Sequence, residues 1–150
     1  WFDRFKMSLD DAVDMFKSFH AQHHNKRRVK IQLAPANLHW CSDKALTLLS
    51  DASAKYDAPM HMHLVETAYQ KEYARRRGDC TALEYIDRFG MVTNRLTLGH
   101  GVWLNEKDID RLAVAGGCVV VGCNDRESAN SSNVDDGLLP AKSLLGVTRR

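Results

Sequence analysis

The chain has 150 residues, in which 21 lysines and arginines nearly balance 19 aspartates and glutamates, so the formal net charge is only +2. This length suffices for one domain with a real core, and the balanced charge gives no support for a nucleic-acid or membrane-surface partner. No apolar run is long enough to span a bilayer, and we expect no membrane partner.

The cysteine pattern indicates the redox compartment of the protein, and the chain ends indicate how much of a domain the sequence covers. The four cysteines are Cys41, Cys80, Cys118 and Cys123, which form no CxxC pair. Reduced thiols in a cytoplasmic protein are therefore expected. The chain starts abruptly at Trp1 and stops at Arg150, where an apolar strand is expected to begin. We expect residues 1–150 to be an internal piece of one domain, with no internal boundary.

The first half of the chain alternates between helical and extended patterns. Ser8 and Ser42 each precede a run with apolar side chains at helical spacing, which is typical of helix N-caps. Pro35 ends an extended segment. The expected elements are a helix over 8–22, a strand over 29–34, a helix over 43–56 and a strand over 59–65.

The second half continues the alternation. The expected elements are helices over 67–76 and 80–89, a strand over 96–100, a helix from Asn105 to Ala115, a strand over 118–121, a polar loop over 122–136 and a short helix over 138–145. The strand at 118–121 is apolar throughout, as in strands buried on both faces. Alternating strands and helices predict an α/β fold with a parallel sheet, either half a barrel or part of an open sheet.

Polar residues follow the predicted strands at their carboxyl ends, where parallel α/β folds gather functional groups. They are Asn37, His39, His63, Glu66, His100, Asn124 and Asp125. Strand alternation puts His61 and His63 on one face. Two imidazoles there need polar partners, and a metal ion is one such partner. Glu66 is suited to moving protons beside a metal-activated water. The alternative interpretation is two hydrogen-bonded core histidines and a surface glutamate.

Read together, several segments resemble the amidohydrolase superfamily, most closely its aminohydrolase and chlorohydrolase branch of deaminases and triazine hydrolases. The matching segments are Leu33-Ala34-Pro35, Cys41-Ser42, His63-Leu64-Val65-Glu66-Thr67, Leu98-Gly99-His100-Gly101-Val102-Trp103-Leu104, Asp108-Ile109, Gly116-Gly117-Cys118-Val119-Val120 and Gly137-Leu138-Leu139-Pro140. The resemblance implies a partial (β/α)8 TIM-type barrel, about strands four to seven with their helices.

The resemblance also implies roles for three residues. His63 would bind the metal, Glu66 would shuttle protons between water and substrate, and His100 would hydrogen-bond the water or substrate, or in some members bind the metal. His61 receives no fixed role. Dinuclear relatives use a modified lysine at the end of strand four, whereas Lys30 lies near the other end, so one divalent metal is expected, with zinc favoured and iron as the alternative.

The function implied is hydrolysis by metal-activated water, which attacks an sp2 carbon and most often breaks a C–N bond of a small nitrogen heterocycle. A homo-oligomer is compatible with the full-length protein. The family usually has a His-Asn-Pro-like stretch after strand seven and then a Ser-Asn pair. In this sequence Asn124 or Asn133 is the candidate counterpart, and the histidine is absent. This departure leaves open an inactive relative with a binding or structural role. An unrelated phosphate-binding α/β domain is disfavoured, because no Gly-rich phosphate loop follows a strand.

Overall fold

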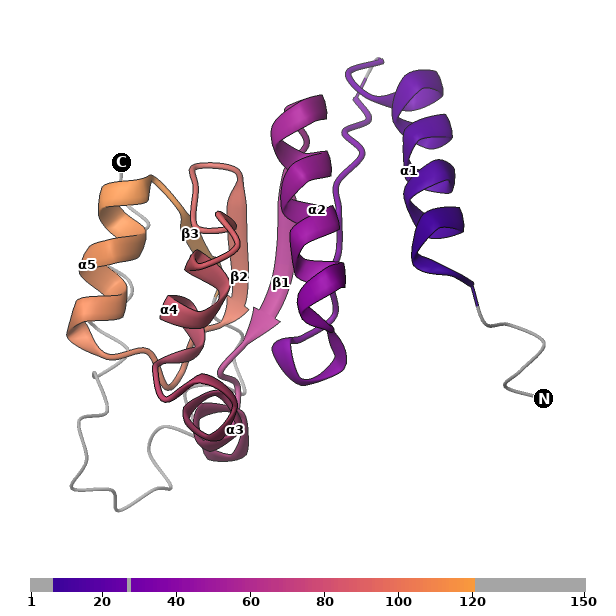
Figure 1. Ribbon diagram of the computed structural model, residues 1–150. Coiled ribbons are helices and arrows are strands. Elements are labelled where there is room, and N and C mark those ends of the chain that lie inside the picture. Colours follow the sequence, from indigo (N-terminus) through magenta and orange to yellow (C-terminus); the bar gives the residue numbers. More distant parts are fainter. Residues whose placement is uncertain (1–6, 27, 121–150) are drawn as a thin grey trace.

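The computed structural model describes residues 7–26 and 28–120 (Figure 1). The elements run in the order α1 (Leu9–His23), η2 (Leu38–Trp40), α2 (Asp43–Tyr56), β1 (Met60–Leu64), α3 (Ala68–Gly78), α4 (Ala82–Asp87), β2 (Leu96–His100), α5 (Glu106–Ala115) and β3 (Cys118–Val120). The three strands form one parallel sheet in the order β1-β2-β3. The predicted α/β class with a parallel sheet is confirmed, and the βαβ connections agree with part of a barrel.

The predicted strand over 29–34 is only partly right. Leu33 and Asn37 form isolated parallel bridges to β1, not a regular ladder. Leu33 makes two backbone hydrogen bonds, of 2.8 and 2.9 Å, with residues at the start of β1. Pro35 lies between the two bridges and has no N–H to donate, so it interrupts the pairing. The segment still runs parallel to β1, which makes it an irregular edge of the sheet.

Local capping explains where the helices begin. The hydroxyl of Ser8 accepts from the backbone N–H of Asp11 at 3.0 Å, and that of Ser42 accepts from Ala45 at 3.2 Å. Asn105 and Asp108 form a capping box at the start of α5. Each contact satisfies a helix N–H that has no partner inside the helix. The helices predicted after Ser8, Ser42 and Asn105 are therefore confirmed.

The sheet is covered on one face by helices. The side chains of Met60, Met62 and Leu64 on β1 are 0–1% exposed and join a core with α2, α3 and α4. On the opposite face His63, Cys118 and Val120 are exposed. The expectation that strand 118–121 is buried on both faces is therefore wrong for the described residues 118–120. The helices pack on the face of β3 that carries Val119, and they leave the other face uncovered.

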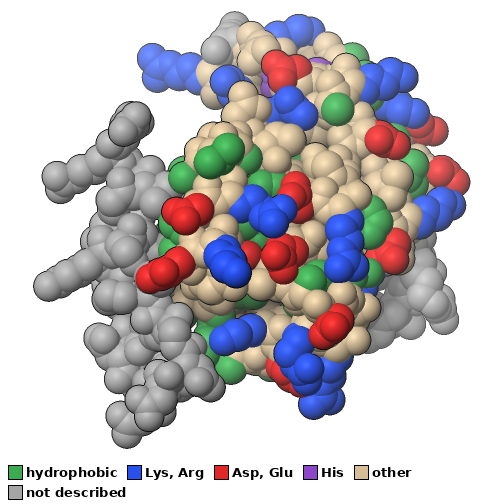
Figure 2. All heavy atoms as spheres, turned by 60° about the vertical axis from the view of Figure 1, so that its left-hand side comes forward, with side chains coloured by type: hydrophobic (Ala, Val, Ile, Leu, Met, Phe, Trp, Pro, Cys, Tyr) green, Lys and Arg blue, Asp and Glu red, His purple; other side chains and the backbone are tan. Residues whose placement is uncertain are grey.

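The described helices include none long and apolar enough to cross a membrane. On the face that Figure 2 shows, acidic and basic side chains are interspersed among apolar ones. Residue 121, the loop predicted over 122–136 and the helix predicted over 138–145 lie outside the described residues, as does Cys123.

Candidate active site

The predicted site residues come from the carboxyl ends of two neighbouring strands. His61 and His63 lie on β1, and His100 is the last residue of β2. In the parallel register His63 is opposite Gly99, and Leu64 is opposite His100. The alternation predicted for β1 is confirmed, because its methionines and leucine are buried while its histidines face the other way. The fold thus brings the three histidines together at one edge of the sheet.

His63 and His100 are in direct contact. His63 Nδ1 and His100 Nε2 lie 3.0 Å apart, within hydrogen-bond distance, and the ring centroids are 5.1 Å apart. The ring of His61 stands edge-on to that of His63, with centroids 5.3 Å apart. Gly99 lies beneath them: a Cβ there would be 3.1 Å from His63 Nδ1 and 3.4 Å from His61 Nε2. The missing side chain therefore leaves the space that the imidazoles occupy.

The backbone is strained at both strand ends. Val65, just after β1, has φ 47°, and His100 has φ 74°. Left-handed backbone is costly for residues other than glycine, and most of all for β-branched ones. Such strain concentrates at functional sites, where the surrounding structure holds it in place. At this site it coincides with the turn that brings Glu66 and His100 to the edge of the sheet.

Glu66 lies between β1 and α3. Its Oε2 is 3.7 Å from His100 Nε2, too far for a good hydrogen bond and an ion pair only when the imidazole is protonated. The backbone N–H of Glu66 donates to Gln70 Oε1 at 2.9 Å, and Thr67 caps α3. These contacts fix the backbone of Glu66, whereas its half-exposed carboxylate keeps freedom to reach a bound molecule.

A pocket of about 520 Å³ opens at this edge of the sheet. Its lining includes Asn37, His39, Trp40, His61, His63, Glu66 and Gln70. The sequence pointed to most of these residues from their positions after predicted strands, but it missed Trp40 and Gln70. Trp40 directly precedes the matched Cys41-Ser42 segment, a signal that could have found it. A pocket of similar volume, about 510 Å³, lies among α3, α4 and α5, but none of the three histidines lines it.

The donor atoms fit part of a zinc site. Two nitrogens bound to one tetrahedral zinc at about 2.0–2.1 Å would be about 3.3 Å apart. The 3.0 Å between His63 Nδ1 and His100 Nε2 is close to that separation. Within residues 7–26 and 28–120, however, no group of three or more His, Cys, Asp or Glu side chains is arranged to hold a metal ion. The described residues by themselves therefore do not form a complete metal site.

The histidines and the nearby glutamate lie at the carboxyl ends of parallel strands, where active sites form in α/β barrels. The sequence pattern of the amidohydrolase family matches residues 8–143, so the chain belongs to the amidohydrolase family. This membership confirms the family resemblance that the strand-end motifs carry.

Curated relatives support the same branch of the family. The chain is 28% identical over 123 residues to a 5-methylthioadenosine/S-adenosylhomocysteine deaminase of Pyrococcus furiosus, covering 82% of this chain and 28% of the relative. It is 29% identical over 108 residues to an 8-oxoguanine deaminase of Pseudomonas aeruginosa, covering 72% of this chain and 24% of the relative. The chain thus spans about a quarter of the length of these relatives.

Solved structures share the fold. An adenosine deaminase from Xanthomonas campestris with bound zinc superposes with a TM-score of 0.80 at 24% identity, over 92% of this chain and 30% of that one. A guanine deaminase from C. acetobutylicum with bound guanine superposes with a TM-score of 0.79 at 18% identity, over 95% of this chain and 34% of that one. At these identities the likeness shows the fold alone.

Proposed function

We propose that the chain is part of a metal-dependent hydrolase that breaks a C–N bond, or displaces another leaving group, at an sp2 carbon of a nitrogen heterocycle. The observation that carries this proposal is that His63 and Glu66 line one pocket and that His100 lies against both of them. Membership of the amidohydrolase family and the activities named for its relatives support it. We further propose that residues 1–150 belong to one (β/α)8 barrel domain and supply about strands four to seven.

Each residue has a distinct role in this proposal. His63 is the metal ligand, with zinc favoured because two of the solved neighbours hold it. Bound zinc acts as a Lewis acid and lowers the pKa of a coordinated water. Glu66 accepts a proton at a carboxylate oxygen and returns it to the leaving nitrogen, a role that its half-exposed position at the pocket permits. His100 donates or accepts a hydrogen bond at the reacting centre and is held against His63.

The pocket also suits a planar substrate. His39 and Trp40 give it an aromatic wall, while Asn37 and Gln70 add amide groups that can hydrogen-bond ring nitrogens. Relatives named for 5-methylthioadenosine, 8-oxoguanine and guanine point to the same class of small heterocycle. A cytoplasmic location and a homo-oligomer remain predictions from the sequence.

The test uses the full-length protein, loaded with zinc and incubated with a panel of aminated purines, pyrimidines and triazines. We expect ammonia release from at least one compound, and we expect His63→Ala to lose metal and turnover together. The matched control is His23→Ala, because His23 is exposed on α1 and does not line the pocket. Unchanged metal content in His63→Ala would refute the ligand assignment. Bound metal without any turnover would favour the inactive relative.

A further inference from the structure

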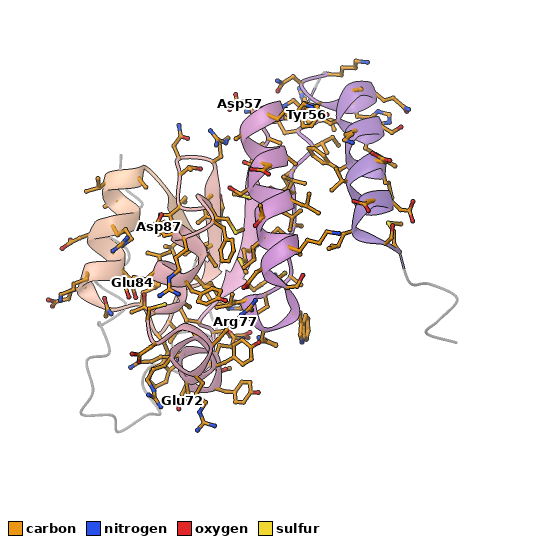
Figure 3. The ribbon with its side chains drawn as sticks, in the orientation of Figure 1. Tyr56, Asp57, Glu72, Arg77, Glu84 and Asp87 are labelled. Carbon is orange, nitrogen blue, oxygen red and sulfur yellow. The ribbon has the colours of Figure 1, made fainter. Side chains whose placement is uncertain are left out.

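Arg77, near the end of α3, is the centre of a network that joins four elements. Its Nη1 donates to the carbonyl of Leu38 in η2 at 2.8 Å. Its Nε donates to the hydroxyl of Tyr85 in α4 at 3.0 Å, and Nη2 donates to the carboxylate of Asp43 in α2. The guanidinium also lies 4.8 Å from the centre of the Tyr85 ring. Figure 3 shows Arg77 between α3 and the lower end of α2.

The network is closed on itself, with Arg77 and Tyr85 shielded from water and the carboxylate of Asp43 open to it. The hydroxyl of Tyr85 donates to the same Asp43 carboxylate at 2.9 Å. The hydrogen bonds from Tyr85 and Arg77 hold the pKa of Asp43 below its usual value. The side chain of Arg77 is only 17% exposed. Partly buried, charge-assisted hydrogen bonds of this kind are stronger and more specific than exposed ion pairs.

What the network holds is one wall of the candidate pocket. Leu38 begins η2, and its neighbours Asn37, His39 and Trp40 line the pocket beside His63. A single 3₁₀ turn has poor hydrogen-bond geometry of its own. Here the bond from the backbone N–H of Cys41 to the carbonyl of Leu38 is long, at 3.3 Å. The bond from Arg77 to that carbonyl ties the turn to α3.

Both ends of this wall are therefore anchored by one side chain. Arg77 binds Leu38 at the start of the turn and Asp43 at the start of α2, five residues later. A lysine cannot replace it, because the planar fork of arginine presents several donors in a fixed geometry whereas an ammonium is a single point. The three partners lie in different directions around that fork.

We propose that Arg77 is a positioning residue that sets substrate affinity by holding the turn Leu38–Trp40 in place as a wall of the pocket. The affinity part rests on the function proposed above. Arg77 does not line the pocket, and His63 and His100 lie on β1 and β2, outside this network. The backbone of Glu66 is held by Gln70 in the first turn of α3, whereas Arg77 lies near the other end of that helix. Loss of Arg77 should therefore weaken binding and leave the chemical step nearly intact.

The experiment compares Arg77→Lys and Arg88→Lys in the full-length protein. Arg88 is the matched control because it lies 5.4 Å from the centre of the same Tyr85 ring and donates to a backbone carbonyl, that of Gly78, at 3.0 Å. We expect Arg77→Lys to raise KM by about tenfold, the scale of one lost charge-assisted hydrogen bond, with kcat within about twofold. Arg88→Lys should leave both constants near wild type.

Hydrogen exchange provides a readout that does not depend on turnover. We expect the amides of residues 38–42 to exchange faster in Arg77→Lys, while those of α5 keep their wild-type rate. Unchanged exchange in residues 38–42, equal acceleration in α5, or a fall in kcat at constant KM would each overturn the proposal. If no substrate is turned over, the proposed function fails, and the exchange rates alone decide whether Arg77 positions the turn.

Discussion

At the scale of single residues, the site depends on the small size of Gly99. Gly99 lies directly opposite His63 in the parallel register, and a Cβ there would press on the imidazoles of His63 and His61. His100 follows immediately and reaches His63 from a left-handed backbone conformation. The two rings can therefore lie close together because Gly99 leaves space for them and because the strained backbone of His100, the next residue, turns its ring toward His63. Ordinary strand packing requires neither feature.

Glu66→Gln tests the proton-transfer role. The amide keeps the shape of the carboxylate but cannot accept the proton. We expect turnover of a confirmed substrate to fall by about two orders of magnitude or more, the usual scale for a general acid–base group, with metal content unchanged. The exposed Glu106→Gln on α5 is the control. Near-normal turnover would refute the role, and loss of metal would make Glu66 a ligand instead.

A comparison of His100→Asn with His61→Asn tests the motif assignment. Both histidines lie near His63, but only His100 makes a hydrogen-bond contact with it and approaches Glu66. We expect His100→Asn to reduce kcat/KM more than His61→Asn, measured in one assay with one substrate. An equal loss of kcat/KM in the two variants, or a larger loss in His61→Asn, would mean that the strand register or the motif assignment is wrong.

At the scale of elements, α1 is the helix held least firmly. Of its residues only Phe16 is buried, and Phe19 and Met15 are about half exposed. Its C-terminal half rests through His20 on Tyr56, which Figure 3 shows at the end of α2. The ring of His20 also stacks on that of His24, with centroids 4.1 Å apart. The Nε2 atom of His20 is buried without a hydrogen-bond partner. Protonation of His20 should therefore weaken this contact.

The docking of α1 should therefore weaken in acid. Burial, reinforced by the neighbouring His24, lowers the pKa of His20 below the usual histidine value of 6.5. A histidine with a lowered pKa in the folded state stabilises the fold above 6.5, and this stability is lost as the pH falls through the folded-state pKa. We expect faster hydrogen exchange in α1 at about pH 5.5 than at about pH 7.5, after correction for intrinsic rates.

The control is His20→Phe, which keeps the ring contacts with Phe16 and Tyr56 but cannot be protonated. Protection of α1 in this variant should change little between the two pH values. The same loss of protection in His20→Phe as in the wild type would show that another group is responsible.

At the scale of the whole molecule, the described residues form a sheet with one covered face. Cys118 and Val120 are exposed on the other face, which also carries the histidines. A further apolar groove, with a volume of about 410 Å³, lies between α1 and the segment 31–35 and includes Met15 and Phe19. Open edges and uncovered apolar faces favour association or aggregation. Both features agree with a sheet that continues in a larger barrel.

Residues 1–150 expressed alone should consequently show no activity. A catalytic zinc site needs about three protein ligands and a water, and the described residues offer no such group. We expect weak zinc affinity, self-association and no hydrolysis of aminated heterocycles, measured by metal titration, solution mass and ammonia release. A soluble monomer with tight stoichiometric metal and clear turnover would contradict both the incomplete site and the placement of these strands in a larger barrel.

The amino-acid sequence was sufficient for the helix caps and for the alternation along β1, which depend on near neighbours. The caps at Ser8, Ser42 and Asn105 act within three residues, and the alternation along β1 follows from the geometry of one strand. The family motifs likewise pointed to His63, Glu66 and His100, because strand ends can be recognised locally. Pro35 was taken as the end of a strand, whereas it interrupts an irregular edge that continues to Asn37.

Tertiary structure alone decided the features that join distant segments. The contact between His63 and His100 spans 37 residues and depends on the register between β1 and β2. The bond between Arg77 and Leu38 spans 39 residues, and no local pattern distinguishes Arg77 from the neighbouring Arg75 and Arg76, which pair with Glu72 at the surface. The rotation of a helix and the register of a strand determine which of several similar residues makes a long-range contact. Both depend on how the whole core packs.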